Sequence, residues 1–469
     1  MSMLTLREAA TLIPGATILG DETTPLDRVS TDSRTTGPGD LFVALKGDRF
    51  DAHEFLGQVA ERHASAVLVS RSPADWRVPA LRVSDTRVAL QDLARGWRAK
   101  FALPVVAVTG SNGKTTVKGM IASIFAAAVG DDARLATAGN LNNDIGVPLT
   151  LLRMRASHRL AVIELGMNHP GETEVLARIA QPTISLINNA QREHQEFMAT
   201  VEAVALEHAS VIHALPDGGH AVFPADDAYA GIWRVAATDR QIVDFALDHD
   251  TAAVRGRRQS DGRLHIDTPA GALDVALNVI GDHNLRNALA ATAAAYAAGV
   301  ALDAIRAGLE AFEPVTGRLQ RKRAALAPFT GMTVIDDTYN ANPDSMRAAI
   351  DVLAAQSGRR AIVIGDMGEV GDHATAFHRE IGAYARERGI DALFALGEET
   401  RESVRAFGEH AVHCDSVDGL IAALSAWPGV DAGRQHEQDT ILVKGSRFMR
   451  MERVVRALTL EGAPDSGAH

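Results

Sequence analysis

The sequence predicts an α/β protein of three domains, with a parallel sheet in the central one. The chain has 469 residues, too many for a single core, because domains average roughly 150 residues. From residue 104 onward, apolar runs typical of strands buried on both faces alternate with helical segments, a pattern that indicates a parallel sheet covered by helices. The alternation restarts after residues 314–317. We therefore expect domains at residues 1–103, 104–316 and 317–469.

The composition excludes several classes of protein and partner. A net charge of -12 argues against a nucleic-acid partner, because few cations are available to release its counterions. The single cysteine, Cys414, rules out intrachain disulfides and fits a reducing compartment. Arg7 and Glu8 stand where a signal peptide needs an apolar run, and the longest apolar stretch, 288–302, is shorter than the roughly 20 residues that span a bilayer. We expect a cytoplasmic protein without stable membrane insertion.

In the first domain the expected elements are strands at 40–47 and 65–70 and a helix at 89–101.

The central domain begins at Pro104. Its expected strands are 105–110, 160–166 and 183–189, and its expected helices are 114–129, 172–180 and 201–215. Residues 248–277 are more polar and alternate in hydropathy, which suggests a small antiparallel insertion. A helix follows within 281–299, with Gly281 before it and Asp282 as the expected N-cap.

The third domain repeats the alternation of strand and helix. Its first helix is expected at 342–355, with Asn342 at the N-cap and Pro343 in the first turn. The expected strands of this domain are 332–337, 360–366, 391–397 and 440–446.

The stretch PVVAVTGSNGKTTVKGM, which starts at Pro104, resembles a phosphate-binding loop that lacks one part. The usual loop reads G-x-x-x-x-G-K-[ST], but Val108 stands where the leading glycine belongs, and Gly110 comes two residues later. A glycine-rich turn between a strand and a helix points backbone N–H groups at an anion. Lys114 is then placed for the phosphates and Thr115 for Mg²⁺. The predicted ATP-binding loop comprises Gly110, Ser111, Asn112, Gly113, Lys114, Thr115 and Thr116.

Two further side chains are candidates for catalysis and metal binding. Glu164 ends the strand LAVIE, where a carboxylate can bind Mg²⁺ directly or through water. His194 follows the strand TISLI, whose carboxyl end lies where ligands bind in such sheets. Read alone, Glu164 fits a solvated strand end and His194 a structural histidine equally well. Asp336 and Asp337 also resemble a metal-binding strand end, but in the third domain nucleotide or amine contacts are the preferred interpretation.

The GSNGKTT loop with Glu164 downstream resembles the Mur ligase family, ATP-dependent enzymes that form amide bonds in peptidoglycan precursors. Members of that family carry the short G-x-x-G-K-[ST]-T loop. The stretch 30–53 is similar to the family's UDP-sugar domain, and GNLNNDIGVP, ELGMNHPGE and NNAQREHQEF fit its central domain. The resemblance implies an N-terminal UDP-MurNAc-binding domain, a central P-loop ATPase domain and a C-terminal Rossmann-like domain.

The resemblance also implies roles for particular residues. Asn284 and Asn287, one helical turn apart, would contact the nucleotide, Arg318 its phosphates, and His194 a second metal or its water. The substrate-binding residues expected in this way are Ser33, Arg34, Lys46, Asn140, Asn143, Asn340, Asn342 and Arg447.

The third-domain motifs DDTYNANPDSM, GDMGEVG and VKGSRFMRME resemble those of the last ligase in the peptidoglycan series. This implies that D-alanyl-D-alanine is joined to UDP-MurNAc-tripeptide through an acyl phosphate, with ATP and Mg²⁺. Separately, we expect a monomer. The sequence leaves open whether the tripeptide carries lysine or diaminopimelate. Two other functions are compatible with parts of the pattern. The N-terminal TDSR unit speaks against a folylpolyglutamate synthase, and the lack of an N-K-x-D motif speaks against a GTPase-like switch.

Two positions depart from the family pattern. The motif D-G-H reads Asp51-Ala52-His53, which puts the local turn in doubt. A helix that normally carries a lysine, carbamylated in some members to bind a second Mg²⁺, has Glu207-His208 instead, and the chain contains no lysine between Lys118 and Lys322. His208 fits either a weak metal partner or a surface histidine of an amphipathic helix.

Overall fold

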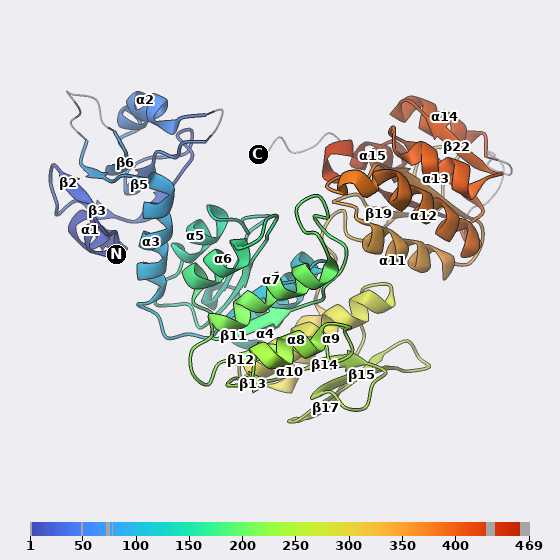
Figure 1. Cartoon of the computed structure of the whole chain (residues 1–469), viewed down its shortest axis with the longest axis horizontal. Helices are drawn as coiled ribbons and strands as arrows, with labels where there is room; N and C mark the ends of the chain where they lie inside the picture. The colour runs from blue at the N-terminus through green and yellow to red at the C-terminus, as the bar shows by residue number, and fades with distance from the viewer. Residues whose placement is uncertain (1, 48–49, 72–75, 77, 428–436, 460–469) are drawn as a thin grey trace.

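The computed structural model describes residues 2–47, 50–71, 76, 78–427 and 437–459. Three α/β bodies follow one another along the chain, and Figure 1 shows the first (blue) and the last (orange and red) on either side of the central one. We refer to them as the first, central and third units and keep the proposed boundaries after residues 103 and 316. None of the helices within the described ranges is long and apolar enough to cross a membrane.

The first unit is a sheet of strand order β2-β7-β6-β5-β4. Side chains of β5 and β6 are buried along their whole length, as expected for strands covered on both faces. The strands are β1 (Leu4–Thr5), β2 (Thr17–Leu19), β3 (Pro25–Leu26), β4 (Arg28–Ser30), β5 (Asp40–Val43), β6 (Ala66–Val69) and β7 (Ala80–Arg82). The helices are α1 (Leu6–Leu12), α2 (Leu56–Glu61) and α3 (Thr86–Arg98).

Helix α3 attaches the first unit to the central one. The indole Nε1 of Trp97 donates to the Met154 carbonyl at 3.1 Å, and the guanidinium of Arg98 donates to the Ala180 and Gln181 carbonyls at 3.2 and 3.0 Å. These bonds satisfy carbonyls at the ends of central-unit elements, and one hydrophobic cluster runs through both units. The first unit is therefore packed on the central unit through α3.

The central unit is a fully parallel sheet of order β13-β12-β11-β8-β10-β9. Alternate residues of β8 point to opposite faces: Val105 and Ala107 join the core under α5 and α6, whereas Val106 and Val108 pack under α4. Its strands are β8 (Val105–Thr109), β9 (Arg134–Ala136), β10 (Leu160–Glu164), β11 (Ile184–Ile187), β12 (His220–Val222) and β13 (Gln241–Ile242). Its helices are α4 (Lys114–Val129), α5 (Gly146–Leu151), α6 (Glu172–Ala180), α7 (Val201–His213) and α8 (Ala230–Ala236).

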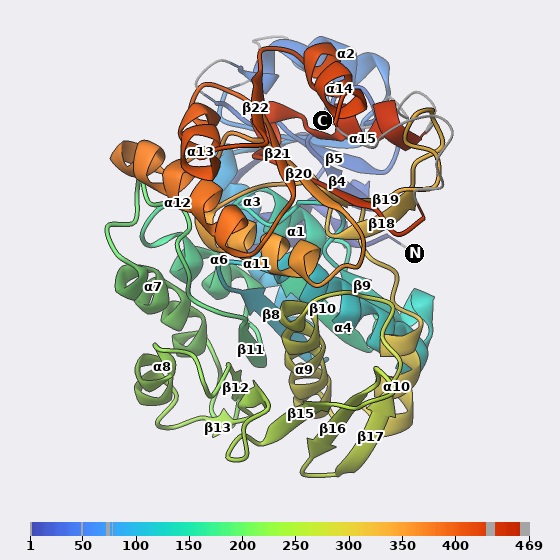
Figure 2. The same cartoon turned by 90° about the vertical axis from the view of Figure 1, so that its right-hand side faces the viewer.

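The expected antiparallel insertion is confirmed for β15 (Val254–Arg258), β16 (Leu264–Thr268) and β17 (Gly271–Val275). These strands lie at the bottom of Figure 2, and β14 (Phe245–Leu247) joins β15 in parallel. Helices α9 (Asp282–Ala297) and α10 (Leu302–Glu310) follow and pack against α4.

The prediction that Asp282 is the N-cap of α9 is wrong by one residue. Gly281 is the N-cap, and its φ of +88° lies in the left-handed region that favours glycine. A Cβ at this position would also come within 2.6 Å of Val352 Cγ2. Asp282 is therefore the first helical residue, where its charge still complements the helix dipole.

The third unit has strand order β18-β19-β23-β20-β21-β22, in which only the edge strand β18 is antiparallel. The predicted N-cap of α11 is confirmed, because the Asn342 side chain accepts from Ser345 N at 2.8 Å. Its strands are β18 (Gln320–Arg323), β19 (Thr333–Asp337), β20 (Arg360–Gly365), β21 (Ala392–Leu396), β22 (Ala411–Cys414) and β23 (Thr440–Lys444). Its helices are α11 (Pro343–Ala354), α12 (Ala374–Glu387), α13 (Thr400–Phe407), α14 (Val417–Ser425) and α15 (Glu452–Thr459).

The Asp51-Ala52-His53 turn forms without a glycine. Ala52 begins a 3₁₀ turn, Ala52–Phe55, that needs no positive φ. The Asp51 carboxylate accepts from His53 N at 3.0 Å and contacts the His53 ring at 2.6 Å. His53 Nε2 in turn accepts from Ser70 N at 3.0 Å. The aspartate and histidine hold this turn, so the alanine leaves it intact.

We predict that Gly308→Ala destabilises the central unit. A Cβ at this position of α10 would lie 2.3 Å from the Ile124 Cα in α4, so the two helices would have to move apart, at a cost of about 1–3 kcal/mol. Gly231→Ala in α8 is the matched control, because nothing lies within 4 Å of its added Cβ. Thermal melting should show a lower transition for Gly308→Ala only; equal transitions would contradict the close packing of α4 and α10.

Candidate active site

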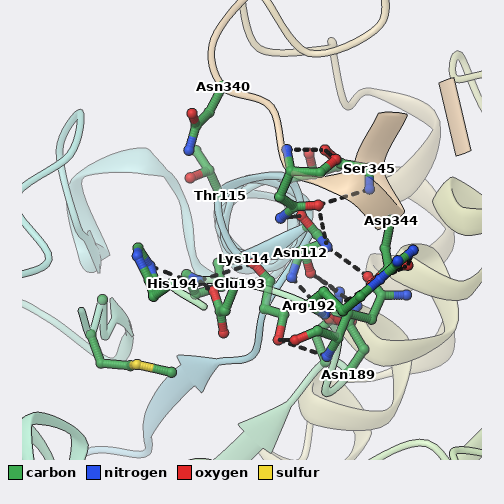
Figure 3. Close-up of a pocket in the computed structure, with 18 of the residues that line it drawn as sticks. Asn112, Lys114, Thr115, Asn189, Arg192, Glu193, His194, Asn340, Asp344 and Ser345 are labelled. Carbon is green, nitrogen blue, oxygen red and sulfur yellow. Dashed lines mark hydrogen bonds and ion pairs between the residues drawn. The ribbon is translucent and has the colours of Figure 1, made fainter. Parts of the chain in front are cut away.

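A cavity of about 1050 Å³ lies between the central and third units. Figure 3 shows part of it, with Lys114, Glu193 and His194 close together and Asp344 and Ser345 reaching in from the third unit. The stretches that contribute most of its lining are 111–116, 164–172, 188–195, 283–287, 317–319 and 339–345. Strands β8, β10 and β11 are neighbours in the parallel sheet, and the loops after them meet here, where ligands bind in such sheets.

The loop after β8 has a backbone that only glycine allows at two positions. Gly110 has φ +127° and Gly113 has φ +82°. A Cβ on Gly110 would lie 2.9 Å from Asn188 N, and one on Gly113 would lie 2.6 Å from both Asn188 Nδ2 and Asn287 Oδ1. The two glycines of the shortened loop are therefore required both for backbone conformation and for space.

Lys114 is the first residue of α4, and its ammonium lies over the loop. Its Nζ donates to the Gly110 carbonyl at 2.5 Å and to the Ser111 carbonyl at 3.2 Å, and it lies 3.4 Å from Glu193 Oε2. The positive end of the helix dipole and this ammonium act at the same place. The arrangement is chemically suited to phosphate anions.

Glu164 and Thr115 form the candidate Mg²⁺ site. Glu164 is 2% exposed, and its Oε1 accepts from the Thr115 hydroxyl at 3.1 Å and from Asn142 Nδ2 at 2.9 Å. Its Oε2 is buried with no hydrogen-bond partner in the described part of the chain. A free carboxylate oxygen beside a hydroxyl fits Mg²⁺, which takes one or two protein ligands and completes its shell with phosphates and water.

No larger metal centre is present among the described residues, which contain no group of three or more His, Cys, Asp or Glu side chains placed to hold an ion. A Mg²⁺ ion at Glu164 would therefore depend on the nucleotide for further ligands. Arg318 adds positive charge to this place, because its guanidinium donates to the Thr115 hydroxyl at 2.9 Å and stacks over the Tyr339 ring at 4.1 Å.

Asn284 and Asn287 lie beneath the loop. Asn188 Nδ2 donates to Asn287 Oδ1 at 2.9 Å, and Asn287 Nδ2 donates to Asn284 Oδ1 at 3.0 Å. Asn188 Nδ2 also donates to the Asn112 carbonyl at 2.7 Å. Both predicted residues line the cavity, but their amides bond to each other, to Asn188 and to the Ile280 carbonyl. Their contact with the nucleotide stays a prediction.

His194 lies between two carboxylates. Its Nδ1 is 2.6 Å from Glu369 Oε2 in the third unit, and its Nε2 is 3.8 Å from Glu193 Oε2. The close approach of the His194 ring lowers the pKa of Glu369 against the opposing effect of burial. His194 thus connects the two units across the cavity, and its predicted role at a second metal stays a prediction.

Sequence reasoning missed Glu193. This residue is 5% exposed; Oε1 lies 3.1 Å from His208 Nε2. Burial alone would raise the pKa of Glu193, but the Lys114 ammonium and the two histidines lower it to about 2, so the carboxylate is ionised. Its position directly before His194 was the available signal.

The interpretation of His208 as a surface histidine is wrong, because the side chain is 0% exposed. Its neighbour Glu207 also does not reach the metal site. The Glu207 carboxylate accepts from Gly171 N and Thr173 N, both at 2.8 Å, and so caps the start of α6. A side chain committed in this way is not a Mg²⁺ ligand.

The predicted substrate residues separate into two sets. Asn143, Asn340 and Asn342 line the cavity. Asn143 accepts from Gly146 N at 2.8 Å, and Asn342 Nδ2 donates to Asn112 Oδ1 at 2.9 Å. The residues that lie outside the cavity are Ser33, Arg34, Lys46, Asn140 and Arg447.

The two aspartates after β19 have different environments. Asp337 lines the cavity, and its carboxylate lies 2.7 Å from the Lys444 ammonium. Asp336 is buried, pairs with Lys322 at 3.2 Å and accepts from the Thr338 hydroxyl at 2.6 Å. Only Asp337 is placed for the ligand contact that the sequence suggested.

Arg192 holds the third unit against the central one. Its guanidinium contacts Asp344 in α11 at 2.6 Å and Glu380 in α12 at 2.7 Å, and it lies over the Phe377 ring at 5.3 Å. A bidentate, partly buried contact of this kind is stronger than an exposed ion pair. The third unit is therefore docked beside the phosphate loop.

Known proteins match this chain over its whole length. A model of the Mur ligase middle domain matches residues 108–295, and one of the Mur ligase glutamate ligase domain matches residues 317–447. The UDP-N-acetylmuramoyl-tripeptide–D-alanyl-D-alanine ligase of Escherichia coli is 40% identical over 98% of this chain and 100% of its own. The chain belongs to the Mur ligase family. The ligase of the same name from Bacillus subtilis is 32% identical over 93% of this chain.

Solved structures agree with this membership. A crystal structure of MurF from Acinetobacter baumannii is 35% identical, covers 97% of this chain and 98% of its own, and gives a TM-score of 0.87. MurF ligase from Thermotoga maritima in complex with ADP is 25% identical and gives a TM-score of 0.79 over 92% of this chain and 96% of its own. A Mycobacterium tuberculosis folylpolyglutamate synthase, at 18% identity and a TM-score of 0.62, shares the fold.

We predict that Lys114→Ala abolishes turnover and leaves the fold intact. Loss of a cation aimed at transferring phosphates costs about 10²–10³-fold or more in rate. Turnover and a melting curve would be measured together, with Lys100→Ala, an exposed lysine stacked on Trp97, as the control. Near-normal turnover in a folded Lys114→Ala protein would contradict the assignment of the phosphate loop.

We also predict that the third unit must close on the central one for chemistry, and that Arg192→Ala favours the open form. Small-angle scattering with both substrates should give a larger radius of gyration for this variant. Arg347→Ala is the control, because it removes another bond to Glu380 that does not cross between the units. If Arg192→Ala scatters like the unaltered protein, Arg192 does not hold the units together.

Proposed function

We propose that this Mur ligase joins D-alanyl-D-alanine to UDP-MurNAc-tripeptide and gives UDP-MurNAc-pentapeptide for peptidoglycan synthesis. The observation that carries the proposal is that one cavity combines the phosphate loop of the central unit with the DDTYNANPDSM segment of the third, through the Asn112–Asn342 hydrogen bond. The Escherichia coli relative, which carries the name of this activity, supports it over the full chain.

ATP and Mg²⁺ are the proposed cofactors. The ADP complex of the Thermotoga maritima relative supports a nucleotide at the loop. Lys114 would bind the β- and γ-phosphates, and Thr115 and Glu164 would hold Mg²⁺, whose charge stabilises the transferring phosphoryl group. Asn284 and Asn287 are proposed for the base or ribose, and Arg318 for the phosphates.

The proposed reaction has two steps. A carboxylate is a poor electrophile, so the terminal carboxylate of the tripeptide first attacks the γ-phosphorus of ATP, giving an acyl phosphate and ADP. Lys114, over the loop, and Arg318, beside Thr115, would balance the charge of this transfer. The amine of D-alanyl-D-alanine then attacks the acyl carbon, and phosphate leaves as the amide bond forms.

The substrate sites extend beyond the cavity. Ser33, Arg34 and Lys46 are proposed to bind the UDP-sugar in the first unit. Asn140 and Asn143 would contact the same substrate nearer the loop. Asn340, Asn342 and Arg447 would bind on the third-unit side. The Arg447 guanidinium lies 5.9 Å from the Tyr339 ring centre. We further propose a cytoplasmic monomer, since the single cysteine fits a reducing compartment.

The deciding experiment is an ADP-release assay with each substrate omitted in turn. Release should require both UDP-MurNAc-tripeptide and D-alanyl-D-alanine, and the product mass should equal the pentapeptide. Tripeptides with lysine or diaminopimelate at the third position would be compared in the same assay. Release with a folate and glutamate, or with no acceptor at all, would instead favour a folylpolyglutamate synthase or a nucleotide hydrolase.

A further inference from the structure

Glu193 is a buried carboxylate in a cavity suited to phosphates. Its Oε2 lies 3.4 Å from the Lys114 ammonium and 3.8 Å from His194 Nε2, and Figure 3 shows the three side chains side by side. A fixed anion beside bound phosphates raises the energy of the complex, because like charges repel strongly where water is excluded. Such a group needs a cation of its own once a nucleotide is bound.

The orientation of this carboxylate is fixed from behind by His208. An ionised carboxylate only accepts hydrogen bonds, so His208 Nε2 carries the proton that it donates to Glu193 Oε1 at 3.1 Å. Nδ1 is then free to accept from the Thr109 hydroxyl at 3.0 Å. His208 and Thr109 are both 0% exposed. This chain of bonds leaves Oε2 facing the cavity, in the way that a buried partner orients a metal ligand.

The single charge of Lys114 cannot neutralise both the Glu193 carboxylate and bound phosphates. It is the cation nearest to Glu193 Oε2 among the contacts of that carboxylate, and it is also the ammonium placed for the phosphates. A divalent ion shared by Glu193 and a phosphate would compensate both charges. Mg²⁺ accepts this arrangement, since it binds through one or two carboxylates together with phosphates and water.

We propose that Glu193, oriented by His208, binds a second Mg²⁺ ion beside the transferring phosphoryl group. The inference rests on the proposed use of ATP. The first ion remains with Thr115 and Glu164. Where relatives use a carbamylated lysine, this chain has His208, and no lysine occurs from residue 119 to residue 321. Glu193 then supplies the anionic oxygen, and His208 is a positioning residue rather than a ligand.

The test counts bound ions. Mn²⁺ would replace Mg²⁺ and be titrated by electron paramagnetic resonance in the presence of a non-hydrolysable ATP analogue. We expect about two ions per chain, as in other two-metal phosphoryl-transfer sites, and about one in Glu193→Gln. His208→Asn should weaken the second ion about 10–100-fold. The control is Glu202→Gln, an exposed glutamate of α7, which should bind like the unaltered protein.

Two further variants keep the test decisive. Glu193→Asp is used if the glutamine variant does not fold, because it preserves the charge. Its shorter side chain withdraws the carboxylate and should weaken binding of the second ion. Glu193→Ala combined with His208→Lys should recover the second ion only with bicarbonate, together with a carbamate signal in the ¹³C spectrum. Two ions in folded Glu193→Gln, unchanged affinity in Glu193→Asp, or one ion in the unaltered protein would each overturn the proposal.

The outcome is separable from the proposed function. The ions are counted before any tripeptide or D-alanyl-D-alanine is added, so a wrong acceptor would leave the count unchanged. An unaltered protein that ligates but binds only one Mn²⁺ would overturn this inference alone. Dependence of the second ion on dissolved CO₂ in the unaltered protein would also overturn it, because a carbamate would then be the ligand.

Discussion

The close approach of the phosphate loop to Asn188 and Asn287 is the constraint on which the rest of the site depends. Gly110 and Gly113 have no Cβ, and a Cβ would not fit at either position. The backbone can therefore bend tightly after β8 and start α4 at Lys114. That start fixes where the helix dipole points and where the ammonium lies. It also brings Thr115 to Glu164 at 3.1 Å, so the candidate phosphate and metal positions follow from one turn.

The same loop is the surface on which the third unit docks. Asn112 bonds to Asn342, the residue that caps α11, and Thr115 accepts from Arg318. A nucleotide bound at the loop would therefore act on the docking contacts as well. Arg192 adds a bidentate contact outside the loop, which gives the docked state a component independent of the nucleotide.

Local chemistry made most of the fold predictable. The expected ranges of α4 and α6 are the observed ones, because each helix follows a glycine turn after a strand. The errors arose where distant segments decide. Asp282 lost the cap position to Gly281, where the distant Val352 leaves no room for a Cβ. His208 lies on a helix of mixed polarity, and only the packing of α7 under β8 shows that it is buried. Glu193 was overlooked because its role depends on both Lys114 and His208, which are remote in sequence.

The polar groups beneath the loop are mostly amides, and this choice has a physical reason. Asn188, Asn284 and Asn287 satisfy one another and the loop backbone as both donors and acceptors. Carboxylates in the same places would also accept these bonds, but they would place negative charge directly under bound phosphates. Lysines would compete with Lys114 for the phosphates. Two carboxylates instead contact the side chains that begin α4: Glu164 lies beside the Thr115 hydroxyl and Glu193 beside the Lys114 ammonium. Oε2 of Glu164 has no hydrogen-bond partner in the described part of the chain, whereas Glu193 is held by His208.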